Sequence, residues 1–363
     1  GSVGAGTNIA LDSNGAVHIC SKVIGSDNLY YTTNVSGSWQ SATLDSSGNV
    51  GGDCFIILDS DDDIHITYRD DSNTNLKYAT KALSNGITAS NWAISTMDNN
   101  GDVGNFGSMA VDANDTLHVA YYAASSTVLK YATLTDGSTT WSKEVVESTN
   151  DVGKYTSIAL DSNGNPHITY YDDTNDDLRY THKMGSSWVF TTLDSVGVSG
   201  KGTSLAIDSN DHLHVAYKTN STEVAYMTNR SGSWVKTTLD ANSTGTWGVN
   251  YINIMLDEAT IRTWSIRTWS ITTSSTCPTR VGHGNAFLLL AIQSVRLRRR
   301  RWMRTAEFTL RTISTDPSMI LAMQPYVVSP IGLNLRLNPT CQTVFYSVLI
   351  TVQFTEHPLS TLI

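Results

Sequence analysis

Five histidines stand at a fixed distance from an aspartate, and these pairs are the residues whose types and spacing could do chemistry. Each histidine follows its aspartate by six residues, and the pairs are Asp12 with His18, Asp59 with His65, Asp112 with His118, Asp161 with His167, and Asp208 with His214. An imidazole can bind zinc, but zinc ligands must converge within about 2 Å of one ion. Because the pairs repeat one pattern along the chain, we predict that each histidine hydrogen-bonds a neighbouring strand or turn and that none is catalytic.

The same aspartates open short acidic segments that resemble calcium loops. The segment 59–63, Asp-Ser-Asp-Asp-Asp, resembles one most closely. Calcium takes about six to eight oxygen ligands, and the longer EF-hand loop with its distant glutamate is absent. Hydrogen bonds from turn N–H groups to the aspartate explain these residues without an ion. We therefore predict no metal site and no cofactor, with Ca²⁺ as the alternative.

The aspartates mark an internal repeat. With Asp257 as the start of a sixth copy, the steps between them are 47, 53, 49, 47 and 49 residues. Two further markers keep the same phase, a tyrosine near the third strand (Tyr30, Tyr78, Tyr131, Tyr180 and Tyr226) and a tryptophan that opens the fourth (Trp39, Trp92, Trp141, Trp188 and Trp234). We predict that the tryptophans pack between repeats, because repeats of this length bury a continuous core by stacking on one another.

Each repeat contains four short β-branched or alternating runs separated by Asn, Asp, Gly and Ser, which is the pattern of strands joined by hairpins. In the fourth repeat we expect strands at Ser157–Leu160, His167–Tyr171, Leu178–His182 and Trp188–Leu193. A sheet of four short strands cannot bury its faces alone, so the units must stack like the blades of a β-propeller.

We therefore predict an all-β fold, a β-propeller of four-stranded antiparallel blades within residues 1–257. Five complete blades are expected at about residues 7–47, 54–100, 107–149, 156–196 and 203–242, followed by the first strand of a sixth from residue 251.

The repeat motif D-x-N-G-x-x-H-[IV]-x-Y, with a later G-x-W and a D-x-V-G crossover, resembles the repeats of secreted propellers in the BNR or sialidase-like superfamily. The resemblance covers residues 1 to about 257. It implies a propeller fold and an extracellular or cell-surface location. It also implies a role among those of this group, which holds glycosidases, lyases and lectins.

The pattern stops after Asp257. Residues 1–257 carry 13 Lys and Arg against 29 Asp and Glu, whereas residues 258–363 carry 11 against 4. This basic tail contains a duplicated Arg-Thr-Trp-Ser-Ile and a run of four arginines, Arg298 to Arg301. We expect it to be irregular, as an out-of-frame or disordered segment would be, and a genuine basic C-terminal domain is the alternative.

Ligands of propellers usually bind where the turns between second and third strands meet the crossovers between blades. In this sequence those loops are acidic and variable and contain aromatic residues, which suit sugar hydroxyls as well as a solvated surface. The candidate ligand-binding residues there are Asp53, Asp70, Asp71, Asp102, Phe106, Asp151, Tyr155, Asp172, Asp173 and Trp247.

Composition and the absence of certain motifs argue against several classes of function. The net charge of −9 argues against a protein that neutralises nucleic-acid phosphates, and no apolar run approaches the roughly 18 residues of a membrane span. The repeats contain three arginines, Arg69, Arg179 and Arg230. A sialidase site needs three arginines around the substrate carboxylate, and we expect Arg179 to be a surface residue of a strand, so such a site is not predicted. The sequence also contains no nucleophile elbow and no Walker loop. Cys20 and Cys54 do not imply a disulfide framework.

We expect an extracellular or surface binding scaffold without catalytic activity, whose partner is a glycan or another protein. Two alternatives stay open. One is a sialidase-like glycoside-processing enzyme, either a glycoside hydrolase or a polysaccharide lyase. The other is a truncated fragment without function, because an open ring exposes two blade faces.

Overall fold

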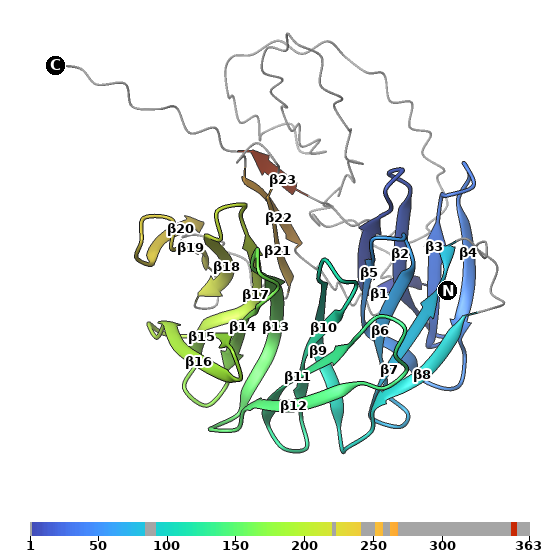
Figure 1. Ribbon diagram of the computed structural model, residues 1–363, viewed down its shortest axis with the longest axis horizontal. Helices are drawn as coiled ribbons and strands as arrows, with labels where there is room; N and C mark the ends of the chain where they lie inside the picture. Colours follow the sequence, from blue (N-terminus) through green and yellow to red (C-terminus); the bar gives the residue numbers. More distant parts are fainter. Residues whose placement is uncertain are drawn as a thin grey trace, which may run out of the picture.

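The computed structural model describes residues 2–83, 92–219, 223–240, 251–256, 262–267 and 350–353. Within these ranges the chain forms five four-stranded antiparallel sheets and one three-stranded sheet. The sheets stand around a common axis in sequence order, and each inner strand contacts the next inner strand (Figure 1). The fold is therefore a β-propeller, as the repeat predicts. The described part of the chain contains no helix with the length and apolarity of a membrane span.

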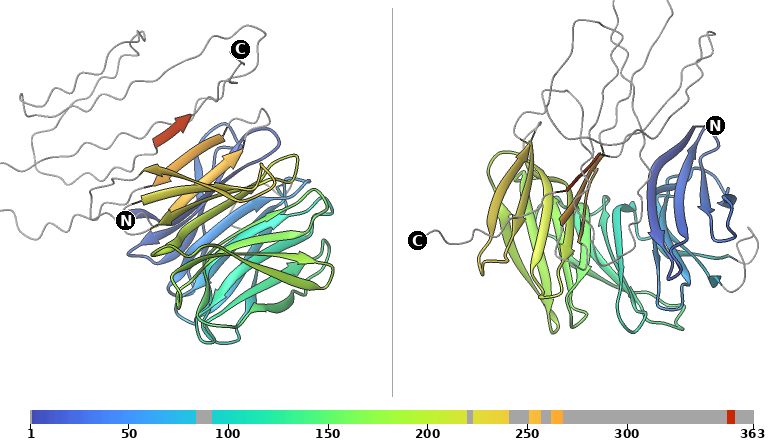
Figure 2. Two further views of the ribbon diagram at one scale, coloured as in Figure 1. Left: turned by 90° about the vertical axis from the view of Figure 1, so that its left-hand side faces the viewer. Right: turned by 90° about the horizontal axis from the view of Figure 1, so that it is seen from above.

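Each four-stranded sheet is one blade whose strands neighbour one another in chain order. The blades form an arc from the first (blue) to the fifth (yellow) when seen from above (Figure 2). The strands of the first two blades are β1 (Ser2–Leu11), β2 (Val17–Ile24), β3 (Asn28–Thr33), β4 (Gln40–Asp45), β5 (Val50–Leu58), β6 (Ile64–Asp70), β7 (Asn75–Lys81) and β8 (Ala93–Asp98). Those of the next three are β9 (Val103–Val111), β10 (Leu117–Ala123), β11 (Val128–Leu134), β12 (Ser142–Glu147), β13 (Val152–Leu160), β14 (Pro166–Asp172), β15 (Asp177–Met184), β16 (Ser187–Asp194), β17 (Ser199–Ile207), β18 (Leu213–Thr219), β19 (Glu223–Thr228) and β20 (Val235–Asp240).

The inner strands begin several residues before the predicted positions. In the fourth blade β13 starts at Val152 rather than Ser157, because the Val-Gly pair of the crossover already belongs to the sheet and Val152 opposes Asp172. A register shift between Lys154 and Ser157 marks a β-bulge in this extension. The same shift occurs in the other four blades.

The sixth sheet has three strands, whereas the sequence predicts only the first. Its strands are β21 (Tyr251–Leu256), β22 (Arg262–Arg267) and β23 (Ile350–Gln353). β21 is the expected inner strand, and its Ile252 and Ile254 are buried against the fifth blade. β22, which is part of the duplicated segment, pairs with β21 and β23. Residues 268–349 and 354–363 lie outside the described residues.

The hydrophobic core lies between neighbouring blades. Ile56, Met109, Ile158 and Leu205 occupy one position on successive inner strands and are 2–7% exposed. At the equivalent position of the first blade Ile9 is 51% exposed, because no described blade covers that face. Burial of one such side chain stabilises the folded protein by about 1.5–3 kcal/mol. The packing of blade on blade therefore supplies most of the driving force for folding.

Glycines in the crossovers let neighbouring blades approach closely. They have φ between 89° and 109°, and an added Cβ would lie 2.8 or 2.9 Å from a leucine of the preceding blade. The pairs are Gly51 with Leu29, Gly104 with Leu76, Gly153 with Leu129, and Gly200 with Leu178. These glycines are required for both backbone conformation and space.

Gly153→Ala should destabilise the protein by about 3 kcal/mol, through left-handed strain and overlap with Leu129. Gly185→Ala is the matched control, because Gly185 also has positive φ but nothing lies within 4 Å of its added Cβ. Urea unfolding of both variants measures the difference. Equal losses in the two variants would contradict the steric explanation.

In each of the first four blades, a carboxylate with little exposure at the end of the outer strand links the blade to the next. Asp45 of β4 accepts hydrogen bonds from the Tyr68 hydroxyl at 2.7 Å and from Lys77, both in the second blade. Asp98, Glu147 and Asp194 occupy the same position in the next three blades. Burial alone would raise the pKa of Asp45, but the hydrogen bonds from Lys77, Ser47 and Tyr68 outweigh it and hold the pKa at about 2.

The stabilisation from Asp45 should depend on pH. Because its folded pKa of about 2 lies below the ordinary 3.8, the contribution is present above pH 4 and is lost as the pH falls towards 2. The difference between a pKa of 3.8 and one of about 2 corresponds to about 2.5 kcal/mol. Asp45→Asn should therefore be less stable than the original protein by about that amount at pH 7. The difference, measured by urea unfolding, should shrink steadily between pH 4 and pH 2, and a constant difference would contradict this.

One disulfide joins the first two blades. Cys20 of β2 and Cys54 of β5 are bonded, with their Cα atoms 6.2 Å apart. Two cysteines in the repeats form no framework from which this pair could be predicted. At the same interface position between the fourth and fifth blades, the hydroxyl of Thr203 donates to that of Thr169 at 3.0 Å.

Candidate functional site

The repeated aspartate, histidine and tyrosine form one polar chain in every blade. The histidine Nδ1 lies 2.5–2.6 Å from the tyrosine hydroxyl, and its Nε2 lies 3.0–3.6 Å from the aspartate carboxylate. The tyrosines are Tyr31, Tyr78, Tyr131, Tyr180 and Tyr226. The prediction of Tyr30 is wrong by one residue, and the error changes the face of β3, because side chains alternate along a strand.

These histidines serve the scaffold. Burial lowers the pKa of His18, His118 and His167, although the neighbouring aspartate opposes that shift. Neutral imidazoles can donate through one nitrogen and accept through the other, which suits a bridge between a carboxylate and a phenol. The five sets repeat one arrangement, so they hold the turn between first and second strands in place.

The repeated tryptophans pack on the tyrosine of the preceding blade. Trp92, Trp141, Trp188 and Trp234 meet Tyr31, Tyr78, Tyr131 and Tyr180 edge to face, with ring centroids 5.1–5.8 Å apart. Trp39 of the first blade is 52% exposed, because no described blade precedes it. These contacts place the tryptophans between blades rather than in a ligand site.

The acidic segment 59–63 makes turn and interface hydrogen bonds. The Asp59 carboxylate accepts the N–H groups of Asp61 and Asp63 at 3.1 and 2.7 Å. The Asp62 carboxylate accepts the N–H and hydroxyl of Ser13 in the first blade at 2.8 and 2.5 Å. Among the described residues no group of three or more His, Cys, Asp or Glu is arranged to hold a metal ion.

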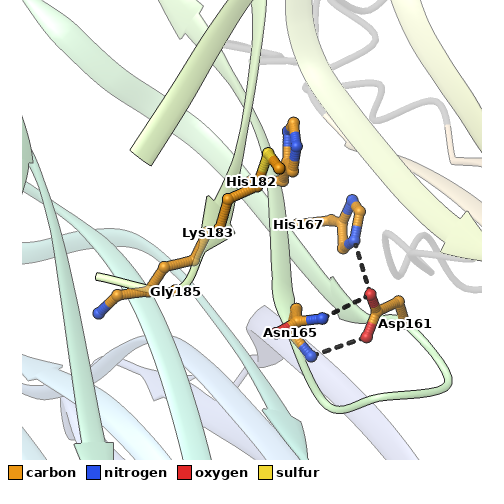
Figure 3. A pocket seen from close by; sticks show the side chains of 7 residues that line it. Asp161, Asn165, His167, His182, Lys183 and Gly185 are labelled. Atoms are coloured by element: carbon orange, nitrogen blue, oxygen red, sulfur yellow. Dashed lines mark hydrogen bonds and ion pairs between the residues drawn. The ribbon is translucent and has the colours of Figure 1, made fainter. Parts of the chain in front are cut away.

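A pocket of about 490 Å³ lies at one end of the fourth blade (Figure 3). Its lining includes Asp161, Asn165, His167 and His182. His182 stacks on His167 with ring centroids 5.4 Å apart, where the other blades have Thr33, Thr80, Thr133 and Thr228. Asn165 and His167 both face the Asp161 carboxylate, whereas the buried Nδ1 of His182 has no hydrogen-bond partner among the described residues.

The opposite end of the ring carries residues that differ from blade to blade. We call it the crossover rim, the end where inner strands begin and second strands finish. The residue in the bulge of each inner strand has a φ of 45–61°, and from the first to the fifth blade these residues are Gly6, Asp53, Phe106, Tyr155 and Gly202. Glycine adopts this conformation freely, whereas a bulky side chain there is strained.

The strained residues lie together. The Asp53 carboxylate accepts the N–H of Phe106 at 3.1 Å, and the rings of Phe106 and Tyr155 are tilted with centroids 4.5 Å apart. Tyr122 and Tyr171 of the neighbouring second strands stand 6.3 and 6.2 Å from these rings. Phe106 and Tyr155 are half-buried and lie beside the buried Tyr122 and Tyr171.

Ion pairs follow the rim on both sides of the aromatic residues. Arg69 pairs with Asp71 at 2.7 Å and with Asp102 at 2.8 Å. Lys154 pairs with Asp151 at 2.8 Å and with Asp173 at 2.6 Å. The Tyr122 hydroxyl also donates to Asp151 at 2.6 Å, and Lys22 of the first blade pairs with Asp71 at 2.9 Å.

Most predicted ligand-binding residues lie on this rim, but Asp70 and Asp172 do not contribute to its surface. Both are buried, and their carboxylates accept hydrogen bonds from the turn residues Asn73 and Asn175. They cap the turns between second and third strands. Trp247 lies outside the described residues.

Sequence reasoning missed the cations and two tyrosines of the rim. These residues occupy two positions of the repeat, the fourth residue after the histidine and the residue opposite it on the inner strand. They are Lys22, Arg69, Tyr122, Lys154, Tyr171, Lys201 and Lys218. A signal was available, because the residue three after the histidine is tyrosine in blades two to five whereas the next one varies. Variation inside a strict repeat marks positions that the scaffold does not fix.

Comparisons with known proteins identify the fold. No family model and no curated protein matches the chain. Among solved structures, AofleA from Arthrobotrys oligospora matches with a TM-score of 0.52 at 12% identity, covering 73% of this chain and 79% of that one. A protein of unknown function from Dyadobacter fermentans matches with 0.53 at 11% identity, covering 73% and 90%.

A third similar structure is a polysaccharide lyase, the PL25 ulvan lyase bound to -[GlcA(1-4)Rha3S]-. It matches with a TM-score of 0.52 at 13% identity, covering 72% of this chain and 75% of that one. The chain shares their fold. At such identities the likeness shows the β-propeller alone, and the implied BNR or sialidase-like superfamily has no matching family model.

Proposed function

We propose that the protein binds a glycan at the crossover rim, as an extracellular propeller without catalytic activity. One observation carries the proposal: Phe106 and Tyr155 occupy a left-handed backbone position that glycine fills in the first and fifth blades. Such strain costs about 1–3 kcal/mol and clusters at functional sites. The fold alone would favour glycine there, so the two aromatic side chains point to a ligand.

The chemistry of the rim suits a sugar ring. Aromatic faces offer the flat apolar surface on which the C–H side of a sugar can lie, while charged groups around them accept and donate hydrogen bonds to hydroxyls. Phe106 and Tyr155 supply the first, and Arg69, Asp102 and Asp173 supply the second. The ion pairs among the charged groups hold their side chains in place before a ligand arrives.

The disulfide supports an extracellular location. Cys20 and Cys54 form a cross-link between two blades, and such bonds persist in oxidising compartments. The same location is implied by the resemblance to secreted propellers. A protein partner instead of a glycan would use the same rim, and a glycan array separates the two.

Replacing the strained residues should separate binding from stability. Phe106→Gly and Tyr155→Gly relieve backbone strain but remove a ring contact, so the free energy of unfolding should change by less than about 1 kcal/mol. Affinity for the strongest oligosaccharide from a glycan array should fall at least about tenfold, measured by isothermal titration calorimetry. Phe190→Ala, on outer strand β16, is the control and should bind normally. Unchanged affinity in both glycine variants would contradict the proposed site.

A processing enzyme is the rival, and turnover distinguishes it from a binding protein. The oligosaccharide found on the array is incubated with the protein and analysed for new reducing ends and for unsaturated products. We expect neither. Release of product that is lost in Asp102→Asn would replace the binding proposal with a catalytic one.

A further inference from the structure

Two lysines of the fifth blade stand next to each other on the crossover rim. Lys201 of β17 opposes Lys218 of β18 in the register of the sheet, and both side chains are half-buried. Within the described residues neither amino group forms an ion pair or a hydrogen bond. Burial lowers the pKa of Lys218, and the charge of Lys201 adds to that shift. Two adjacent ammonium groups without an anion are unfavourable in a half-buried place.

The fourth blade shows how the same position is normally neutralised. Lys154 is the equivalent of Lys201, and each lies over a tyrosine ring of the preceding blade, at 5.4 Å from Tyr122 and 5.0 Å from Tyr171. Lys154 pairs with both Asp151 and Asp173.

The fifth blade lacks both of these acids. The equivalent of Asp151 is Val198, and the equivalent of Asp173, the residue after Thr219, is Asn220. Asp176, whose carboxylate accepts the hydrogen bond of the Tyr171 hydroxyl, forms no ion pair with either lysine. The fifth blade therefore keeps the cation of the fourth, adds a second one and omits both counterions.

We propose that Lys201 and Lys218 bind an oxyanion, the sulfate ester or carboxylate of an acidic glycan whose ring rests on the neighbouring aromatic residues. The anion would take the place of the two missing carboxylates, and the contact between Tyr171 and Tyr155 links the lysines to the aromatic part of the rim. The inference rests on the proposed glycan function, but the anion site itself can be tested without a sugar.

The first test uses inorganic sulfate, titrated into the full-length protein at low ionic strength and followed by NMR of the lysine amino groups. Sulfate should shift the signals of Lys201 and Lys218. Val198→Asp installs the carboxylate that the fourth blade has, and should weaken sulfate binding at least about tenfold, as should Lys201→Gln with Lys218→Gln. Val196→Asp, in the same crossover and exposed, and Lys183→Gln, at the opposite end, are the matched controls and should bind normally. Absence of sulfate binding, or equal weakening in the controls, would overturn the proposal.

The second test compares sulfated and unsulfated forms of one oligosaccharide, and uronic and neutral forms of another, by isothermal titration calorimetry. The original protein should prefer an acidic form about tenfold at 50 mM salt, less at higher salt. Val198→Asp should lose the preference and keep the affinity for the neutral form. If neutral forms bind and acidic forms bind no better, the anion inference fails alone. If sulfate binds as predicted and no glycan does, the proposed function fails alone.

Discussion

A four-stranded sheet of this length cannot bury its own two faces, so the blades must cover one another. Ile158 and its equivalents are covered only because a neighbouring blade lies against them, and Gly153 leaves the space that lets the blades meet. Buried carboxylates such as Asp45 then tie each outer strand to the next blade through a tyrosine and a cation. The exposed Ile9 and Trp39 of the first blade show the same constraint from the other side, since the face without a described neighbour keeps its apolar residues exposed.

The part of this arrangement that sequence reasoning predicts is the part made within one repeat. The aspartate and histidine are six residues apart and the tyrosine follows about 13 residues after the histidine, so periodicity alone brings them together. Errors arise where a shift of one residue along the chain changes the role of a side chain. Tyr30 and Tyr31 differ by one residue and lie on opposite faces of β3. Asp70, the last residue of β6, caps a turn, whereas the next residue, Asp71, pairs with Arg69 on the rim. Composition cannot distinguish such neighbours, because strand register sets the face.

The rest depends on contacts between blades, which no pattern within one repeat contains. Cys20 and Cys54 meet across an interface, and the two rings of Phe106 and Tyr155 meet although they are 49 residues apart in the printed sequence. The bulge that positions these rings lies in a stretch that resembles a loop in composition. The bulge gives Phe106 and Tyr155 their positive φ, and it can be located only when the register of the strands is known. The sequence could nevertheless have marked the rim, because it is where equivalent residues of a strict repeat differ.

Departures from a repeat fall into two kinds, and the difference between them decides where function lies. Some are compensated. Ser60 and Ser162 each donate a hydrogen bond from the hydroxyl to an aspartate of the next blade. Ala113 replaces the serine in the third blade and Gly164 replaces the aspartate opposite it, so the hydroxyl and the carboxylate are lost together. Others leave a cost in place, such as the strained Phe106 and Tyr155 or the adjacent ammonium groups of Lys201 and Lys218. A compensated change keeps the scaffold intact and needs no ligand. An uncompensated one leaves free energy that a ligand can recover on binding, and the two sets named here lie on the same rim.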